Sequence, residues 1–107
     1  MIDLEKMAKE HEKLFERCDL ESQLEKLIEE KNEVLKELVD VAIVCAGIYR
    51  FNQQEALRLM SRVYMACEIL GFKMSDLEAE VNRKWQINLN RKWVWNGKTY
   101  HHEGNDE

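Results

Sequence analysis

Proline is absent from this 107-residue chain, and only four glycines are present, at positions 47, 71, 97 and 104. A β sandwich or a glycine-looped α/β domain needs many more turn residues, so neither class fits the composition. Cysteine is also scarce: Cys18, Cys45 and Cys67 form no C-x-x-C pair and no Cys/His cluster. The sequence therefore predicts neither a disulfide framework nor a structural zinc site, and we expect small buried cysteines in a reducing cytoplasm.

Long hydrophobic runs are missing as well. The longest apolar stretch, residues 41–49, is far too short to span a bilayer, and the charged first residues lack the apolar region of a signal peptide. We therefore expect no membrane association and a cytoplasmic location.

The composition that remains favours one folded domain. Apolar residues make up 45% of the chain, charged residues 35%, and the formal net charge is only -5. This is enough apolar material for collapse, with too little charge imbalance to prevent it. We expect a single helical domain over residues 1–107, with a core between about residues 2 and 92 and a tail over 93–107.

Hydrophobic spacing predicts helices over residues 2–17, 20–51, 53–70 and 76–92, the second being one long helix or two helices joined near residue 35. Capping residues support these bounds. The residues concerned are Asp19 or Ser22, Asn52 with Glu55, Gly71, and Ser75 with Glu78. Asn96-Gly97, between alternating aromatic and polar residues, predicts a hairpin or extended tail that packs on the fourth helix. The predicted fold class is an all-α bundle of about four helices with this short C-terminal hairpin.

Four acids follow the second predicted helix at spacings of three, four and three: Glu30, Glu33, Glu37 and Asp40. On a helix they fall within an arc of about 80°, so the carboxylates form one stripe. The simplest interpretation is a solvated face, whose acids pair with nearby lysines. The lysines available for this are Lys26, Lys31 and Lys36.

Asp40 favours a second interpretation. It is the only polar residue between Leu38 and Tyr49, so we expect an apolar helix to carry it towards the interior. A buried carboxylate requires a cation such as Arg58 or Arg62, a proton, or a divalent metal. The other acids of the stripe favour the metal, because Mg²⁺ prefers oxygen ligands and keeps waters that a phosphate can displace.

Basic residues gather at the opposite end of the chain. Between residues 81 and 102 there are five Lys or Arg and no acid. Lys84, Asn88 and Arg91 share a helix face at i, i+4 and i+7, and arginine offers a planar fork that suits a phosphate group. Trp85, Trp93 and Trp95 lie among them and could equally be packing residues. Nucleic-acid binding is the weaker interpretation, because a net charge of -5 opposes it.

These motifs together resemble the all-α nucleoside triphosphate pyrophosphohydrolases of the MazG and dimeric dUTPase/dCTPase group. Glu29-Glu30-x-x-Glu33 resembles the family's E-E-x-x-E motif, and Glu37-x-x-Asp40 its E-x-x-D motif. Lys84-x-x-x-Asn88-x-x-Arg91 is similar to a K-x-x-x-N-x-x-R element near the family's C-terminus, and the segment that follows has the character of small phage-type members. The resemblance covers about residues 20–45 and 80–100.

The spacing departs from that family in one respect. Its two acidic motifs normally lie on different helices that face each other, whereas only residues 34–36 separate Glu33 from Glu37 here. Either the chain breaks locally at these residues, or a second subunit supplies the opposing acids, or the site is degenerate. In another register the second motif falls at Glu55-x-x-Arg58, where an arginine would repel Mg²⁺ and imply altered or lost catalysis.

The resemblance implies Mg²⁺-dependent hydrolysis of an NTP or dNTP to the monophosphate and pyrophosphate, with Mn²⁺ as a substitute metal. Glu30, Glu33, Glu37 and Asp40 would be the metal ligands and catalytic acids, and Lys84, Asn88 and Arg91 would bind the substrate. The alternative is a noncatalytic helical interaction or scaffold protein of the same fold. We also expect a homo-oligomer, a dimer or tetramer, because residues 39–49 and the helix of Leu57, Val63 and Ile69 expose more apolar surface than a monomer covers.

Overall fold

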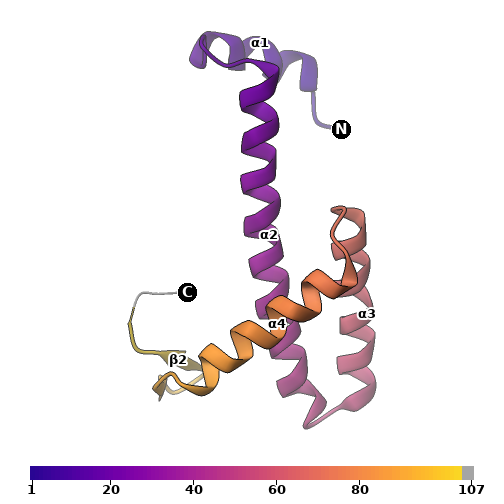
Figure 1. Cartoon of the computed structure of the whole chain (residues 1–107), viewed down its shortest axis with the longest axis vertical. Helices are drawn as coiled ribbons and strands as arrows, with labels where there is room; N and C mark the ends of the chain where they lie inside the picture. The colour runs from indigo at the N-terminus through magenta and orange to yellow at the C-terminus, as the bar shows by residue number, and fades with distance from the viewer. Residues whose placement is uncertain (105–107) are drawn as a thin grey trace. The chain divides into compact units, whose positions relative to one another are not determined.

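A computed structural model describes residues 1–104 of the chain. These residues form four helices and a two-stranded antiparallel hairpin, which confirms the predicted all-α fold class (Figure 1). The elements are α1 (Leu4–Leu14), α2 (Leu20–Tyr49), α3 (Gln53–Ile69), α4 (Met74–Leu89), β1 (Trp93–Trp95) and β2 (Tyr100–His102). The contacts divide the chain into two compact units, residues 1–33 and the residues from Val34 onward. The last three residues of the predicted tail, 105–107, lie outside the described part.

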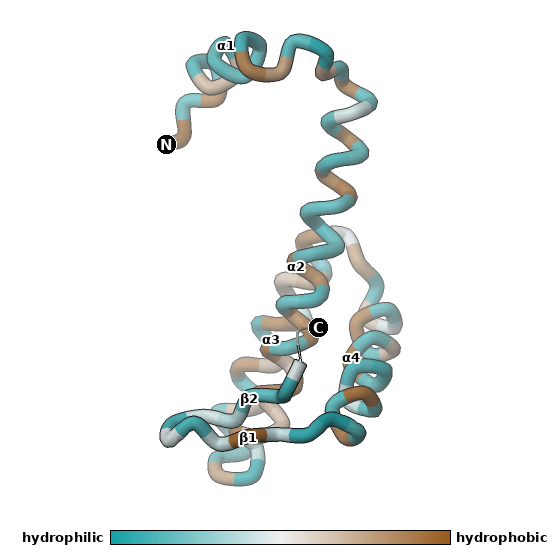
Figure 2. The backbone as a smooth tube through the Cα atoms, turned by 90° about the vertical axis from the view of Figure 1, so that its left-hand side faces the viewer, coloured by the Kyte–Doolittle hydropathy of each residue, from teal (hydrophilic) through white to brown (hydrophobic). Residues whose placement is uncertain are grey.

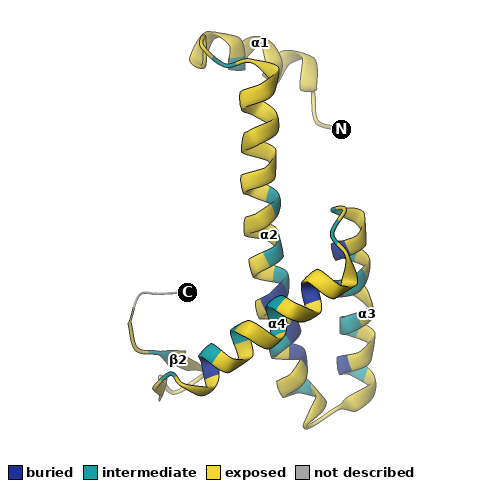
Figure 3. Cartoon of the chain, in the orientation of Figure 1, coloured by how far each residue is buried: buried dark blue, intermediate teal, exposed yellow. Residues whose placement is uncertain are grey.

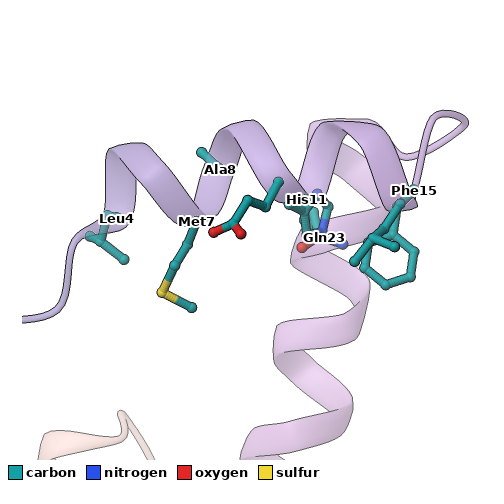
Figure 4. A pocket seen from close by; sticks show the side chains of 8 residues that line it. Leu4, Met7, Ala8, His11, Phe15 and Gln23 are labelled. Carbon is teal, nitrogen blue, oxygen red and sulfur yellow. The ribbon is translucent and has the colours of Figure 1, made fainter.

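The first unit contains α1 and the beginning of α2. Asp3 caps α1, its side chain accepting a hydrogen bond from the Lys6 backbone N–H at 3.0 Å, and the helix ends three residues earlier than predicted. No residue of α1 is buried. Its apolar side chains line an open hollow instead, where the His11 and Phe15 rings lie 4.8 Å apart (Figure 4).

The start of α2 shows reciprocal capping. The Asp19 carboxylate accepts from the Ser22 backbone N–H at 2.8 Å, and the Ser22 hydroxyl accepts from the Asp19 backbone N–H at 3.1 Å. Such a pair satisfies two of the amide donors that a helix start leaves without partners. From this start the helix runs to Tyr49 with no interruption at residues 34–36. One long helix therefore forms, which is the first of the two predicted alternatives.

The core of the second unit lies where three helices meet. Val39 and Ala42 of α2 pack with Val63 and Cys67 of α3 and Leu77 of α4. Figure 3 shows buried positions, in dark blue, on these three helices. Most of these side chains are small. Burial also raises the pKa of the Cys67 thiol, as it does for Cys45 on α2, so both thiols stay neutral.

The predicted caps can be compared with both ends of α3 and with the start of α4. The Asn52 side chain accepts from the Glu55 backbone N–H at 3.0 Å, as predicted. Gly71, with a φ of 87°, follows the end of α3, also as predicted. The Ser75 cap is wrong: α4 begins at Met74, and the Asp76 carboxylate accepts from the Lys73 backbone N–H at 3.4 Å. Asp76 therefore takes the place that Glu78 was expected to have.

Much apolar surface stays outside this core. Brown and teal residues alternate along the helices, as amphipathic faces require (Figure 2). Val44 of α2 is 60% exposed and Ile69 of α3 is 81% exposed, and Val41 and Leu57 are exposed too. Val63, expected on the exposed surface, lies in the core instead. Within residues 1–104, no helix has both the length and the apolar character needed to cross a membrane.

The hairpin predicted at Asn96-Gly97 forms. Strands β1 and β2 pair Trp93 with His102 and Trp95 with Tyr100, and Gly97 has a φ of 95°. The Asn96 side chain accepts from the backbone N–H groups of Lys98 and Thr99 at 2.9 and 2.8 Å, which fixes the turn.

Candidate functional site

An ion pair joins the acidic stripe to the basic helix. The Lys84 ammonium of α4 lies 3.6 Å from a carboxylate oxygen of Asp40 on α2. The Lys84 side chain is only 12% exposed, whereas that of Asp40 is 50% exposed. The packing of α2 against α4 thus brings together a residue predicted to bind metal and a residue predicted to bind phosphate.

Asp40 is not carried into the interior, so that expectation is wrong. The C-terminal part of α2 buries only one side, with Val39, Ala42 and Cys45, and leaves Asp40 and Val41 at the surface. An apolar run therefore did not imply a helix buried all round. The predicted cation partners are also wrong, because the cation beside Asp40 is Lys84.

Arg58 has a different partner. Its guanidinium forms two hydrogen bonds to Glu55 one turn earlier on α3, the Nε bond being 3.0 Å long. This fork lowers the pKa of Glu55, mainly through the hydrogen bond from Arg58. In the alternative motif register, the acid at this position is therefore already neutralised by the arginine of its own motif.

The first acids of the stripe behave as a solvated helix face. In the first unit the Lys26 ammonium lies 3.6 Å from Glu30 and 3.3 Å from Glu29, and all three side chains are largely exposed. The hydrogen bond to Glu29 raises the pKa of Lys26. The lysine pairing expected from i, i+3 and i, i+4 spacing is thus confirmed for Glu30. Glu33 belongs to the first unit, whereas Glu37 belongs to the second with Asp40.

The four acids have the donor chemistry of the predicted metal, and they lie along one helix. All four candidates offer carboxylate oxygens, the donors that Mg²⁺ prefers. However, a single uninterrupted helix carries all of them, and in the described residues no three Asp, Glu, His or Cys side chains gather as a metal site would require.

The other predicted phosphate ligands lie at the end of α4. Asn88 is 8% exposed, and its side-chain oxygen accepts a hydrogen bond from the Arg91 guanidinium at 3.2 Å. Its backbone carbonyl accepts from the Trp93 indole N–H at 2.8 Å. Because α4 ends at Leu89, Arg91 lies beyond the helix rather than on its face, and the predicted end at residue 92 is wrong. Asn88 thereby links the helix to both Arg91 and the hairpin.

The hairpin carries an aromatic face. Directly paired residues of an antiparallel ladder project to the same side, and side chains alternate along each strand. Trp93, Trp95, Tyr100 and His102 therefore share one side, and their rings contact in pairs at centroid distances of 5.6 and 5.1 Å. The sequence left Trp93 and Trp95 open between a ligand-binding and a packing role, and this shared face was not predicted. Their period of two around Asn96-Gly97 was the signal that could have identified it.

Comparison of the chain with protein-family models, with curated proteins and with solved structures found no match in any of the three.

Proposed function

We propose that the chain is a Mg²⁺-dependent nucleoside triphosphate pyrophosphohydrolase that cleaves an NTP or dNTP to the monophosphate and pyrophosphate, and that it works as a homodimer. The proposal starts from the motif resemblance of residues 20–45 and 80–100. The observation that carries it further is the 3.6 Å ion pair between Asp40 and Lys84.

This ion pair suits a site for a polyphosphate that arrives with its cation. The Lys84 ammonium would bind a phosphate oxygen, and the Asp40 carboxylate would then be free for the accompanying cation. The Asp40 side chain is half exposed, so a ligand can reach it from solvent. Arg91, hydrogen-bonded to Asn88 at 3.2 Å, supplies a planar donor group at the end of the same helix.

In the proposed dimer, a second copy supplies acids opposite the stripe of the first. Glu30, Glu33, Glu37 and Asp40 of one copy would face the same acids of the other. The exposed apolar residues Val41 and Val44, adjacent to the stripe on α2, supply surface for such pairing. When bound between the copies, Mg²⁺ would neutralise phosphate charge. The chain's own contribution is to hold the phosphates through Lys84 and Arg91.

The alternative function is a noncatalytic interaction or scaffold protein. Two observations favour it: Lys84 already neutralises Asp40, and Lys26 already pairs with Glu30. The exposed apolar side chains would then bind a partner and serve no active site. The three free cysteines agree with a cytoplasmic location for either function.

An assay of pyrophosphate release separates the two functions. Wild-type protein is incubated with each common ribo- and deoxyribonucleoside triphosphate, with Mg²⁺, with Mn²⁺ and with chelator. We expect metal-dependent release that is lost in Asp40→Asn, while the control Glu5→Gln, which changes an acid of an exposed ion pair on α1, keeps its activity. Absence of release from every nucleotide, together with a melting temperature that Mg²⁺ does not raise beyond matched ionic strength, would leave the scaffold function.

A further inference from the structure

We propose that the aromatic face of the C-terminal hairpin, formed by Trp93, Trp95, Tyr100 and His102, binds the base of the nucleotide. This inference rests on the proposed function and adds a base-binding site that the predicted phosphate and metal residues do not include.

The aromatic rings of this face are arranged in pairs. They form two cross-strand pairs on one side of the hairpin, Trp93 with His102 and Trp95 with Tyr100. Trp95 is 55% exposed and Tyr100 is 63% exposed, so the pair at the turn end of the hairpin offers ring surface to solvent. An exposed pair of rings can stack a nucleobase, because every base has a flat π face.

The aromatic face belongs to a basic segment of the chain. The segment from residue 81 to 102 contains five Lys or Arg residues and no acid, although the whole chain has a net charge of -5. The aromatic face therefore lies in a segment where basic side chains and aromatic rings occur together, and three of these basic residues, Arg83, Lys84 and Lys92, also pair with acids. A ligand with a flat base and an anionic phosphate chain matches both properties.

Hydrogen bonds connect the aromatic face to the predicted phosphate ligands. The Trp93 indole donates to the Asn88 carbonyl at 2.8 Å, and the Asn88 side chain accepts from Arg91 at 3.2 Å. Trp93 follows Arg91 by two residues, so their Cα atoms are separated by at most about 7 Å. A base on the hairpin and phosphates at Arg91 are thus compatible with one nucleotide. The overall negative charge of the chain favours this small ligand over a nucleic-acid strand.

The test compares ligands that share phosphates but differ in the base. Binding of α,β-imido deoxynucleoside triphosphates and of inorganic tripolyphosphate is measured by calorimetry with Mg²⁺, for wild type, Trp95→Leu and Tyr100→Leu. Trp85→Leu is the matched control, because Trp85 is an exposed tryptophan on α4 outside the hairpin. Trp95→Phe keeps an aromatic ring at the same position.

We expect the two leucine variants of the face to weaken nucleotide binding by about fivefold to a hundredfold, the range of base stacking on one aromatic side chain. Tripolyphosphate binding should be unchanged, and Trp85→Leu and Trp95→Phe should stay close to wild type. Unchanged nucleotide affinity in both leucine variants would overturn the inference. So would an equal loss for tripolyphosphate, or a single-stranded oligonucleotide that binds wild type far more tightly than any mononucleotide.

Pyrophosphate release by the same variants distinguishes this inference from the proposed function. Wild-type turnover with unchanged KM in both leucine variants would remove the base site and leave the enzyme. A wild type that neither binds nucleotides nor releases pyrophosphate would remove both.

Discussion

Replacing Asp40 by asparagine should destabilise the metal-free protein, because the more buried partner of the ion pair would lose its counter-charge. Breaking a fully buried pair costs about 3–5 kcal/mol, whereas an exposed pair contributes about 0–1 kcal/mol. Here the Lys84 side chain is 12% exposed and the Asp40 side chain 50%, which places the pair between these limits. We therefore expect Asp40→Asn to lower the free energy of unfolding by about 1–2 kcal/mol, and the melting temperature by about 4–8 °C per kcal/mol.

Lys84→Met is the informative counterpart. It removes the buried ammonium and keeps an unbranched chain for packing, while the half-exposed Asp40 stays hydrated. Its cost should therefore be less than about 0.5 kcal/mol, far below that of Asp40→Asn. Urea denaturation followed by circular dichroism, in low and high salt, measures both. Glu55→Gln, which breaks the more exposed pair with Arg58, controls for the general loss of an ion pair.

Two results would refute this reasoning. Equal losses of unfolding free energy in Asp40→Asn and Lys84→Met would mean that the Lys84 ammonium does not depend on Asp40 for its counter-charge. A gain in stability for metal-free Asp40→Asn would mean that repulsion among the stripe's carboxylates outweighs the attraction to Lys84.

Three further predictions concern packing and the backbone. Val44→Lys should convert the expected oligomer into a monomer of 12.8 kDa in sedimentation, and a wild type that already sediments as a monomer contradicts the dimer. Gly71→Ala should lower the free energy of unfolding by about 1–2 kcal/mol, because the φ of Gly71 is 87°. Gly47 lies inside α2 with open space around it, so Gly47→Ala should raise the free energy of unfolding by about 0.5–1 kcal/mol. Melting temperatures that shift in the same direction for both variants would contradict this. Burial raises the pKa of Cys45 and Cys67. The stability that their neutral thiols contribute is therefore complete below the ordinary thiol pKa and decreases as the pH rises above it. Rapid labelling of both thiols in the folded protein would contradict their burial.

Local signals in the sequence predicted local structure well. Asn52 caps α3, Gly71 follows its end, and Asn96-Gly97 forms the hairpin turn, because each of these features depends on a few neighbouring residues. The start of α4 was misplaced because two acids compete within one helical turn. Asp76 satisfies the first amide, and the Ser75-Glu78 pair is therefore not used.

Contacts between distant residues could not be predicted in the same way. Lys84 and Asp40 were assigned to separate groups, and only the packing of α2 against α4 makes them partners. Likewise, the apolar run around Asp40 predicted burial, but one small core buries only one side of that helix. Sequence periodicity indicates which residues share a face, whereas the partner of that face depends on how the helices cross.

The bond from the Trp93 indole to the Asn88 carbonyl bears on how the C-terminal end of the chain unfolds. Strands of three residues form only a marginal hairpin by themselves, and the last carbonyls of a helix need partners that the helix cannot supply. The Asn88 carbonyl also accepts from the Arg91 backbone N–H at 3.3 Å, and the indole bond joins this helix end to the hairpin, so we expect the end of α4 and the hairpin to open together. In amide hydrogen exchange, the paired strand amides and those of the last turn of α4 should share one opening free energy. A truncation before Trp93 would then increase exchange at the end of the helix as well.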